Sequence, residues 1–142
     1  MSPRRRAVFF DVENSSRVDH VAHMLDHLDL ARLDRDTELL AVGNWRVVGP
    51  ETAHLLAARG ARLIHSAPAF GVKDWSDLRI AVAAGLWLAA ARVGDRLDIV
   101  TDDQAFDAVG DVAAGRGVIF QRVSYRMLPH APAPKRQRRR RR

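Results

Sequence analysis

The sequence predicts an α/β protein, a three-layer α/β/α sandwich around a mostly parallel sheet of about five strands. Short apolar runs rich in β-branched and aromatic residues alternate with helical segments along the chain. These runs are apolar throughout, which is typical of strands that are buried on both faces of a parallel sheet. The first run, AVFFDVEN, predicts a strand over residues 7–12 that carries Asp11 to its carboxyl end.

The first half of the chain alternates strand and helix. Ser16 is expected to cap a helix whose apolar residues recur at helical spacing over residues 18–28. A second strand is expected over residues 37–42. The helix after it should begin at Pro50 and end at Gly60, because proline suits a first helical position and glycine a helix stop.

The second half continues the same alternation. A short third strand is expected over residues 61–65, and a long helix over residues 75–92. Because its middle is apolar on all sides, this helix is expected to be buried against the sheet. A fourth strand over residues 97–101, a helix over 103–114 and a fifth strand over 118–123 complete the pattern.

Length and composition limit the class of protein. The chain of 142 residues predicts one domain with its own core. It has no cysteine, which excludes disulfides, a thiol nucleophile and a cysteine-based zinc site. The longest apolar run, residues 80–91, is well short of the roughly 20 residues that span a bilayer. No secretion signal is evident. We therefore expect a cytoplasmic protein with no membrane partner.

Charge divides the chain into three parts. The net charge is +6, but residues 1–6 hold three arginines and residues 129–142 hold seven basic residues. The remainder, which contains all 17 acidic residues, carries about −4. We therefore expect a loose basic arm over residues 1–6, a folded domain over residues 7–128 and a disordered arginine-rich tail over residues 129–142.

The arginine-rich tail is a candidate nucleic-acid contact. Like charges at this density bind phosphate backbones through counterion release and do not read sequence. A tail that only confers solubility is the alternative. The candidate contacts in the tail are Lys135, Arg136, Arg138, Arg139 and Arg140.

Acidic residues gather at three points of the chain, two of which directly follow the first and fourth strands. In a doubly wound sheet these strands lie side by side, so their acids should meet at the edge where ligands bind. Adjacent carboxylates repel one another unless cations lie among them, and oxygen-rich clusters suit Mg²⁺ or Mn²⁺. The three groups are Asp11 with Glu13, Asp74 with Asp77, and Asp102, Asp103 and Asp107.

Structural roles also explain each group taken singly. Asp74 is placed to cap the long helix, with Asp77 in its first turn. Thr101 and Gln104 fit a capping box at the start of the last helix. Capping does not explain why two acidic groups follow neighbouring strands, so the sequence favours a metal site.

Three segments in order resemble the NYN branch of the PIN-like ribonucleases: FFDVEN, KDWSDLRIA and IVTDDQAF. In that family the first strand ends in an Asp followed three residues later by an Asn, matched here by Asp11 and Asn14. A Lys followed four residues later by an Asp opens the central helix, matched by Lys73 and Asp77. The fourth strand runs into a motif with two Asp residues, and Asp103 takes the place of the first.

This resemblance implies a metal-dependent endoribonuclease that hydrolyses phosphodiester bonds of single-stranded or structured RNA. The implied catalytic residues are Asp11, Asn14, Asp77 and Asp103. Three of them, Asp11, Asp77 and Asp103, would hold one or two Mg²⁺ or Mn²⁺ ions, which activate water and neutralise charge on the scissile phosphate. Lys73 would contact phosphate. The oligomeric state stays open, a homo-oligomer included.

The chain departs from the family pattern at Ala105, where the second Asp is expected. Asp107 lies four residues after Asp103, on the same face of a helix that begins at Asp103. We therefore expect Asp107 to serve as a replacement metal ligand.

Two other functions remain open from the sequence. The first is a catalytically silent RNA-binding or interaction module of the same fold, suggested by Ala105 and by the tail. The second is a phosphatase of the haloacid dehalogenase type. Asp11 would then be the nucleophile, Lys73 its charge partner, and Asp103 with Asp107 the Mg²⁺ ligands. Glu13 stands where that family usually has a second Asp.

Overall fold

The sheet is entirely parallel. The structure is a computed structural model, and it describes residues 4–13, 17–30, 32–67 and 74–127. These residues form one five-stranded sheet with the strand order β3-β2-β1-β4-β5. The α/β class and the parallel sheet predicted from the sequence are therefore confirmed. The strands are β1 (Arg6–Asp11), β2 (Thr37–Gly43), β3 (Arg62–His65), β4 (Arg96–Val100) and β5 (Ile119–Val123).

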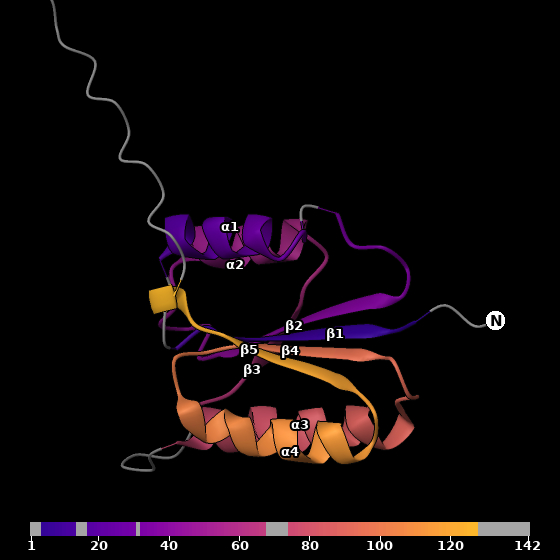
Figure 1. Cartoon of the computed structure of the whole chain (residues 1–142). Coiled ribbons are helices and arrows are strands. Elements are labelled where there is room, and N and C mark those ends of the chain that lie inside the picture. Colours follow the sequence, from indigo (N-terminus) through magenta and orange to yellow (C-terminus); the bar gives the residue numbers. More distant parts are fainter. Residues whose placement is uncertain (1–3, 14–16, 31, 68–73, 128–142) are drawn as a thin grey trace, which may run out of the picture.

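Helices cover both faces of the sheet and complete the three layers. Figure 1 shows α1 and α2 on one face, and α3 and α4 on the other. Within the described ranges, none of the helices is long and apolar enough to cross a membrane. The helical elements are α1 (Val18–His27), α2 (Pro50–Ala58), α3 (Trp75–Ala90) and α4 (Asp107–Gly115), with 3₁₀ turns η1 (Gln104–Phe106) and η2 (Tyr125–Met127).

The central strand β1 supplies apolar side chains to both layers. Val8 and Phe10 belong to the core cluster that also holds residues of α1 and α2. Ala7 and Phe9, which point to the opposite face, belong to the cluster that holds residues of α3. All four side chains are buried. Because neither side of β1 faces solvent, its sequence is a continuous apolar run.

The element boundaries largely follow the sequence pattern. Each of the five strands lies within one residue of its predicted ends. Helix α2 begins at Pro50, and Gly60, with φ of +85°, follows its end as predicted. The predicted cap of α1, Ser16, lies outside the described residues, and Arg17 occupies the N-cap position.

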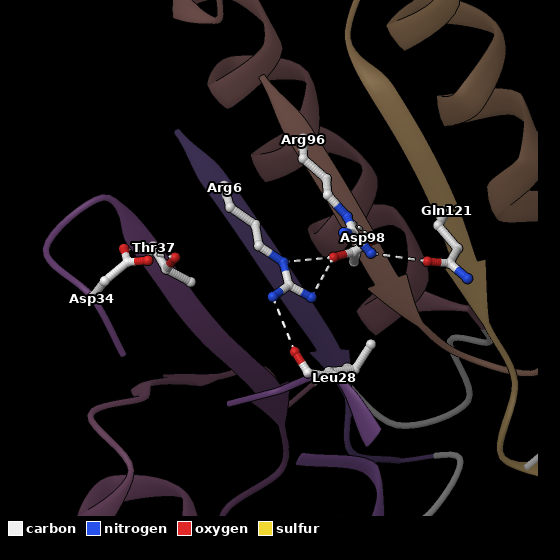
Figure 2. Close-up of polar contacts among 7 residues, drawn as sticks. All are labelled: Arg6, Leu28, Asp34, Thr37, Arg96, Asp98 and Gln121. Carbon is white, nitrogen blue, oxygen red and sulfur yellow. Dashed lines mark hydrogen bonds and ion pairs between the residues drawn. The ribbon is translucent and has the colours of Figure 1, made fainter. Parts of the chain in front are cut away.

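The basic arm expected over residues 1–6 is shorter than predicted, because β1 begins at Arg6. The Arg6 guanidinium binds the buried carboxylate of Asp98 and donates to the backbone oxygen of Leu28 (Figure 2). The backbone N–H of Arg5 donates to Asp95 Oδ1 at 2.9 Å. These contacts join the inner end of the arm to the amino edge of the sheet.

The long helix α3 packs against the sheet as expected, but it is buried on one side only. One side of α3 packs on the sheet through Ile80 and Ala84. The other side leaves Leu78, Val82 and Leu86 64%, 63% and 72% exposed. A helix in an outer layer meets the sheet on one side only. Its other side therefore stays exposed even when the residues there are apolar.

Candidate carboxylate site

Three carboxyl groups from distant parts of the chain meet at the carboxyl edge of the sheet. Asp11 is the last residue of β1, Asp77 lies in the first turn of α3, and Asp103 follows β4. The Asp77 carboxyl group lies close enough to Asp11 and to Asp103 for both of them to act on its pKa. The acids after β1 and β4 come together because these two strands are direct neighbours in the sheet.

The turn after β4 orients two of these groups. Thr101 Oγ1 donates to Asp11 Oδ2 at 3.1 Å and accepts the backbone N–H of Asp103 at 3.2 Å. Asp103 Oδ1 accepts the backbone N–H of Ala105 at 2.9 Å. Asp103 is therefore the side-chain cap of η1, whereas the sequence predicted Thr101 in that role. Thr101 instead links the ends of β1 and β4.

The pKa values of two of these carboxyl groups are raised, by burial and by the negative charges around them. Burial is the main cause that raises the pKa of Asp11 to about 6. Burial also raises the pKa of Asp77 to about 7, followed by the hydrogen bond with Asp103 and the charges of Asp11, Asp103 and Asp74. Near neutral pH these carboxyl groups therefore compete for protons, and a cation would remove the repulsion between them.

Oxygen donors of this kind suit Mg²⁺ or Mn²⁺. In the described part of the chain, no group of three or more His, Cys, Asp or Glu side chains is arranged to hold a metal ion. Asp77 lies near both other carboxyl groups. The donor chemistry thus fits a divalent cation, but the spacing of the three groups is not a ready-made coordination sphere.

Asp107 makes a different contact from the one predicted. The predicted helix over residues 103–114 begins with the 3₁₀ turn η1, and α4 starts only at Asp107. A 3₁₀ turn has three residues per turn, so residues four apart in it differ in direction by about a third of a turn. Asp107 therefore does not lie on the same face as Asp103. The Asp107 carboxylate pairs with Arg122 Nε of β5 at 3.0 Å. Its predicted role as a metal ligand remains a prediction without a supporting contact.

The other acids divide between structural contacts and the surroundings of the site. Asp102 accepts a hydrogen bond from Ser124 Oγ and faces Arg126 at 3.8 Å, so it is held on the β5 side. Asp74 occupies the N-cap position of α3 in a left-handed conformation, without the predicted side-chain cap bond. Glu13 is exposed.

Several predicted residues lie outside the described residues, so the structure places none of them relative to the three carboxyl groups. They are Asn14, Lys73, Lys135, Arg136, Arg138, Arg139 and Arg140.

Tyr125, in η2, is a neighbour of the site that the sequence reasoning missed. Its hydroxyl is buried and has no hydrogen-bond partner in the described part of the chain. Burial, and then the charges of Asp11 and Asp102, raise its pKa. The signal available in the sequence was its place directly after the fifth predicted strand, at the same edge of the sheet as Asp11.

Comparison with protein-family models and with curated proteins gave no match to this chain. The fold and the site define a parallel α/β protein with a carboxylate cluster at the carboxyl edge of its sheet, in which Asp11 is buried and Asp77 and Asp103 are partly exposed.

Proposed function

We propose that the protein is a metal-dependent ribonuclease that hydrolyses phosphodiester bonds at this carboxylate cluster. The observation that supports the proposal most directly is the proximity of Asp77 to both Asp11 and Asp103 at the carboxyl edge of the sheet. Clustered carboxylates raise the energy of the metal-free protein, and such clusters at an accessible sheet edge are typical of functional sites.

Asp11, Asp77 and Asp103 would hold the divalent ion, Mg²⁺ or Mn²⁺. The bound ion would supply activation of water and neutralisation of charge on the scissile phosphate. The turn after β4 keeps two of the carboxylates in place, because Thr101 binds Asp11 and the Ala105 N–H binds Asp103.

Metal binding at this cluster should release protons. The pKa values of about 6 for Asp11 and about 7 for Asp77 mean that the cation competes with protons at neutral pH. We therefore expect the affinity for Mn²⁺ to rise as the pH increases from 6 to 8.

RNA as the substrate rests on two features of the sequence. The first is the resemblance of the motifs around Asp11, Asp77 and Asp103 to the NYN branch of the PIN-like ribonucleases. The second is the arginine-rich run of residues 135–142, which suits a phosphate backbone.

A catalytically silent RNA-binding module is the second candidate. The observation in its favour is the ion pair between Asp107 and Arg122, together with alanine at position 105. If Asp107 stays paired with Arg122, the site has only three carboxylates. The family that the chain resembles has a further Asp, at the position of Ala105.

Single substitutions of the carboxylates test the proposal. Asp11→Asn and Asp103→Asn should each lower Mn²⁺-dependent cleavage of single-stranded RNA by at least about 100-fold, because each removes a charge that holds the ion. Asp111→Asn, an exposed acid on α4, is the matched control and should cleave normally. Thermal unfolding of each variant shows whether the fold is intact.

Two results would count against the ribonuclease. Full EDTA-sensitive activity in Asp11→Asn or Asp103→Asn would exclude the site. Hydrolysis of p-nitrophenyl phosphate without RNA cleavage would favour the phosphatase instead.

A further inference from the structure

A groove of about 500 Å³ lies between the end of β3 and the start of α3. Among the described residues it is lined by His65 at the end of β3, by Ser66 and Ala67 after it, and by Trp75, Leu78, Arg79 and Val82 of α3. The first turn of α3 also carries Asp77, so one helix end forms a wall of the groove and part of the carboxylate cluster. The groove volume is that of a small-ligand site.

We propose that this groove binds a nucleobase of the RNA strand whose phosphate occupies the carboxylate site. The inference rests on the proposed ribonuclease function. Strands β3 and β1 are separated only by β2, so their ends lie about 10 Å apart at the usual strand spacing. A segment of a few nucleotides covers that span.

Trp75 provides the stacking surface. Its indole lines the groove and is 46% exposed. Leu78 and Val82 extend the apolar wall along the same side of α3. Single-stranded nucleic acids are held in this way, by bases that stack on aromatic side chains whatever their sequence.

Two polar groups favour a nucleotide over a purely apolar ligand. Ser66 is 3% exposed, and its hydroxyl has no hydrogen-bond partner in the described part of the chain. A base edge would satisfy that hydroxyl, which is costly to bury alone. Arg79 is exposed and makes no ion pair with any described residue. No acidic side chain is among the described residues that line the groove, so the positive charge of Arg79 is available to a phosphate group of the ligand.

A second copy of the chain is the competing occupant. The exposed apolar residues of α3 continue beyond the groove to Leu86. Burial of this side against another protein would leave the exposed Arg79 guanidinium without a polar partner unless that surface supplied one. The groove itself therefore favours a ligand with hydrogen-bonding edges and negative charge.

Equilibrium binding of a fluorescein-labelled single-stranded RNA trimer tests the inference. The full chain is titrated in EDTA, so that metal-dependent cleavage does not contribute. Trp75→Ala should weaken binding about tenfold, the size expected for one stacked base. Arg79→Gln should also weaken binding about tenfold, because it removes a phosphate contact. Leu86→Ala and Arg92→Gln are the matched controls, since both are exposed, belong to or adjoin α3, and lie outside the groove. They should bind within about twofold of the unaltered protein.

The outcomes separate this inference from the proposed function. Binding within twofold in Trp75→Ala and Arg79→Gln overturns the nucleobase groove, whatever the carboxylate variants do to cleavage. Weakened binding in both variants, with no Mn²⁺-dependent cleavage by the unaltered protein, upholds the groove and overturns the nuclease. Unchanged trimer binding, with Trp75→Ala and Leu86→Ala both dissociating a dimer in sedimentation, shows a self-association surface and overturns the inference.

Discussion

Asp77, in the first turn of α3, lies close enough to Asp11, at the end of β1, for each carboxyl group to act on the pKa of the other. Two neighbouring carboxyl groups repel each other when both are ionised. The pKa values are raised accordingly, chiefly by burial, to about 6 for Asp11 and to about 7 for Asp77. Ionisation of this pair therefore opposes folding of the metal-free protein.

The first prediction is a pH-dependent loss of stability in EDTA. Both carboxyl groups have an ordinary pKa of 3.8, and both are raised in the folded protein. The stability that they contribute is therefore fully present below about pH 4 and is lost as the pH rises through 6 and 7. Asp77→Asn should remove part of this loss, so its Tm at pH 8 should equal or exceed that of the unaltered protein.

Thermal unfolding at pH 4, 6 and 8 measures this effect, with Asp111→Asn as an exposed control. Addition of Mn²⁺ at pH 8 should raise the Tm of the unaltered protein and of the control more than that of Asp77→Asn. Parallel pH profiles for Asp77→Asn and the control would contradict the coupling of Asp77 to Asp11 and Asp103.

The second prediction concerns the charge network at the opposite edge of the sheet. The fully buried Asp98 carboxylate binds Arg6 Nε and Nη2, each at 2.8 Å, and Arg96 Nε at 3.2 Å (Figure 2). Asp98→Ala should lower the free energy of unfolding by about 3 kcal/mol, because it leaves the Arg6 guanidinium, 19% exposed, without its anion. Urea unfolding measures the loss.

Arg96→Ala is the control for this network. Its side chain is 43% exposed, and Arg6 remains to neutralise Asp98. We expect a loss of no more than about 1 kcal/mol, as for other exposed pairs. Equal losses in Asp98→Ala and Arg96→Ala would show that burial of the carboxylate is not the cause.

The features that the sequence predicted correctly are those set by local pattern. Uninterrupted apolar runs mark strands buried on both faces, and this property predicted the parallel sheet and the ends of β1 to within a residue. The position of Asp11 and Asp103 at the ends of neighbouring strands followed from the adjacency of the first and fourth strands. Asp77 joined this set through the family resemblance, and the structure places it near both.

The features that the sequence did not predict depend on tertiary contacts. An apolar surface on every side of α3 carries no periodic signal, so the exposed side with Leu78 could not be told from the buried side. The pairing of Arg6 with Asp98 and the bond from Thr101 to Asp11 join residues far apart in the chain. Because the 3₁₀ turn η1 stands where an α-helix was predicted, Asp107 points in a different direction from the one expected.

The third prediction concerns the arginine-rich tail. Deletion of residues 129–142 removes seven basic residues. It should weaken binding of single-stranded RNA and flatten the dependence of the binding constant on salt, because fewer counterions are released. Filter binding between 50 and 300 mM KCl, roughly spanning physiological ionic strength, measures the slope. An unchanged slope would exclude the tail from the RNA interface.

The last prediction concerns Asp107 and Ala105, where the chain departs from the family that it resembles. The Asp107 carboxylate is 61% exposed, and Arg122 keeps its hydrogen bond to the Thr101 carbonyl oxygen, so Asp107→Ala should lower stability by no more than about 1 kcal/mol. It should leave Mn²⁺-dependent cleavage unchanged, because Asp107 pairs with Arg122 Nε at 3.0 Å. Ala105→Asp should raise the affinity for Mn²⁺ and the cleavage rate, because it returns a carboxylate next to Asp103 on η1. Asp111→Asn controls for loss of charge on α4. If Asp107→Ala instead loses activity as severely as Asp103→Ala and Ala105→Asp adds nothing, Asp107 leaves Arg122 when the ion binds and serves as the replacement ligand.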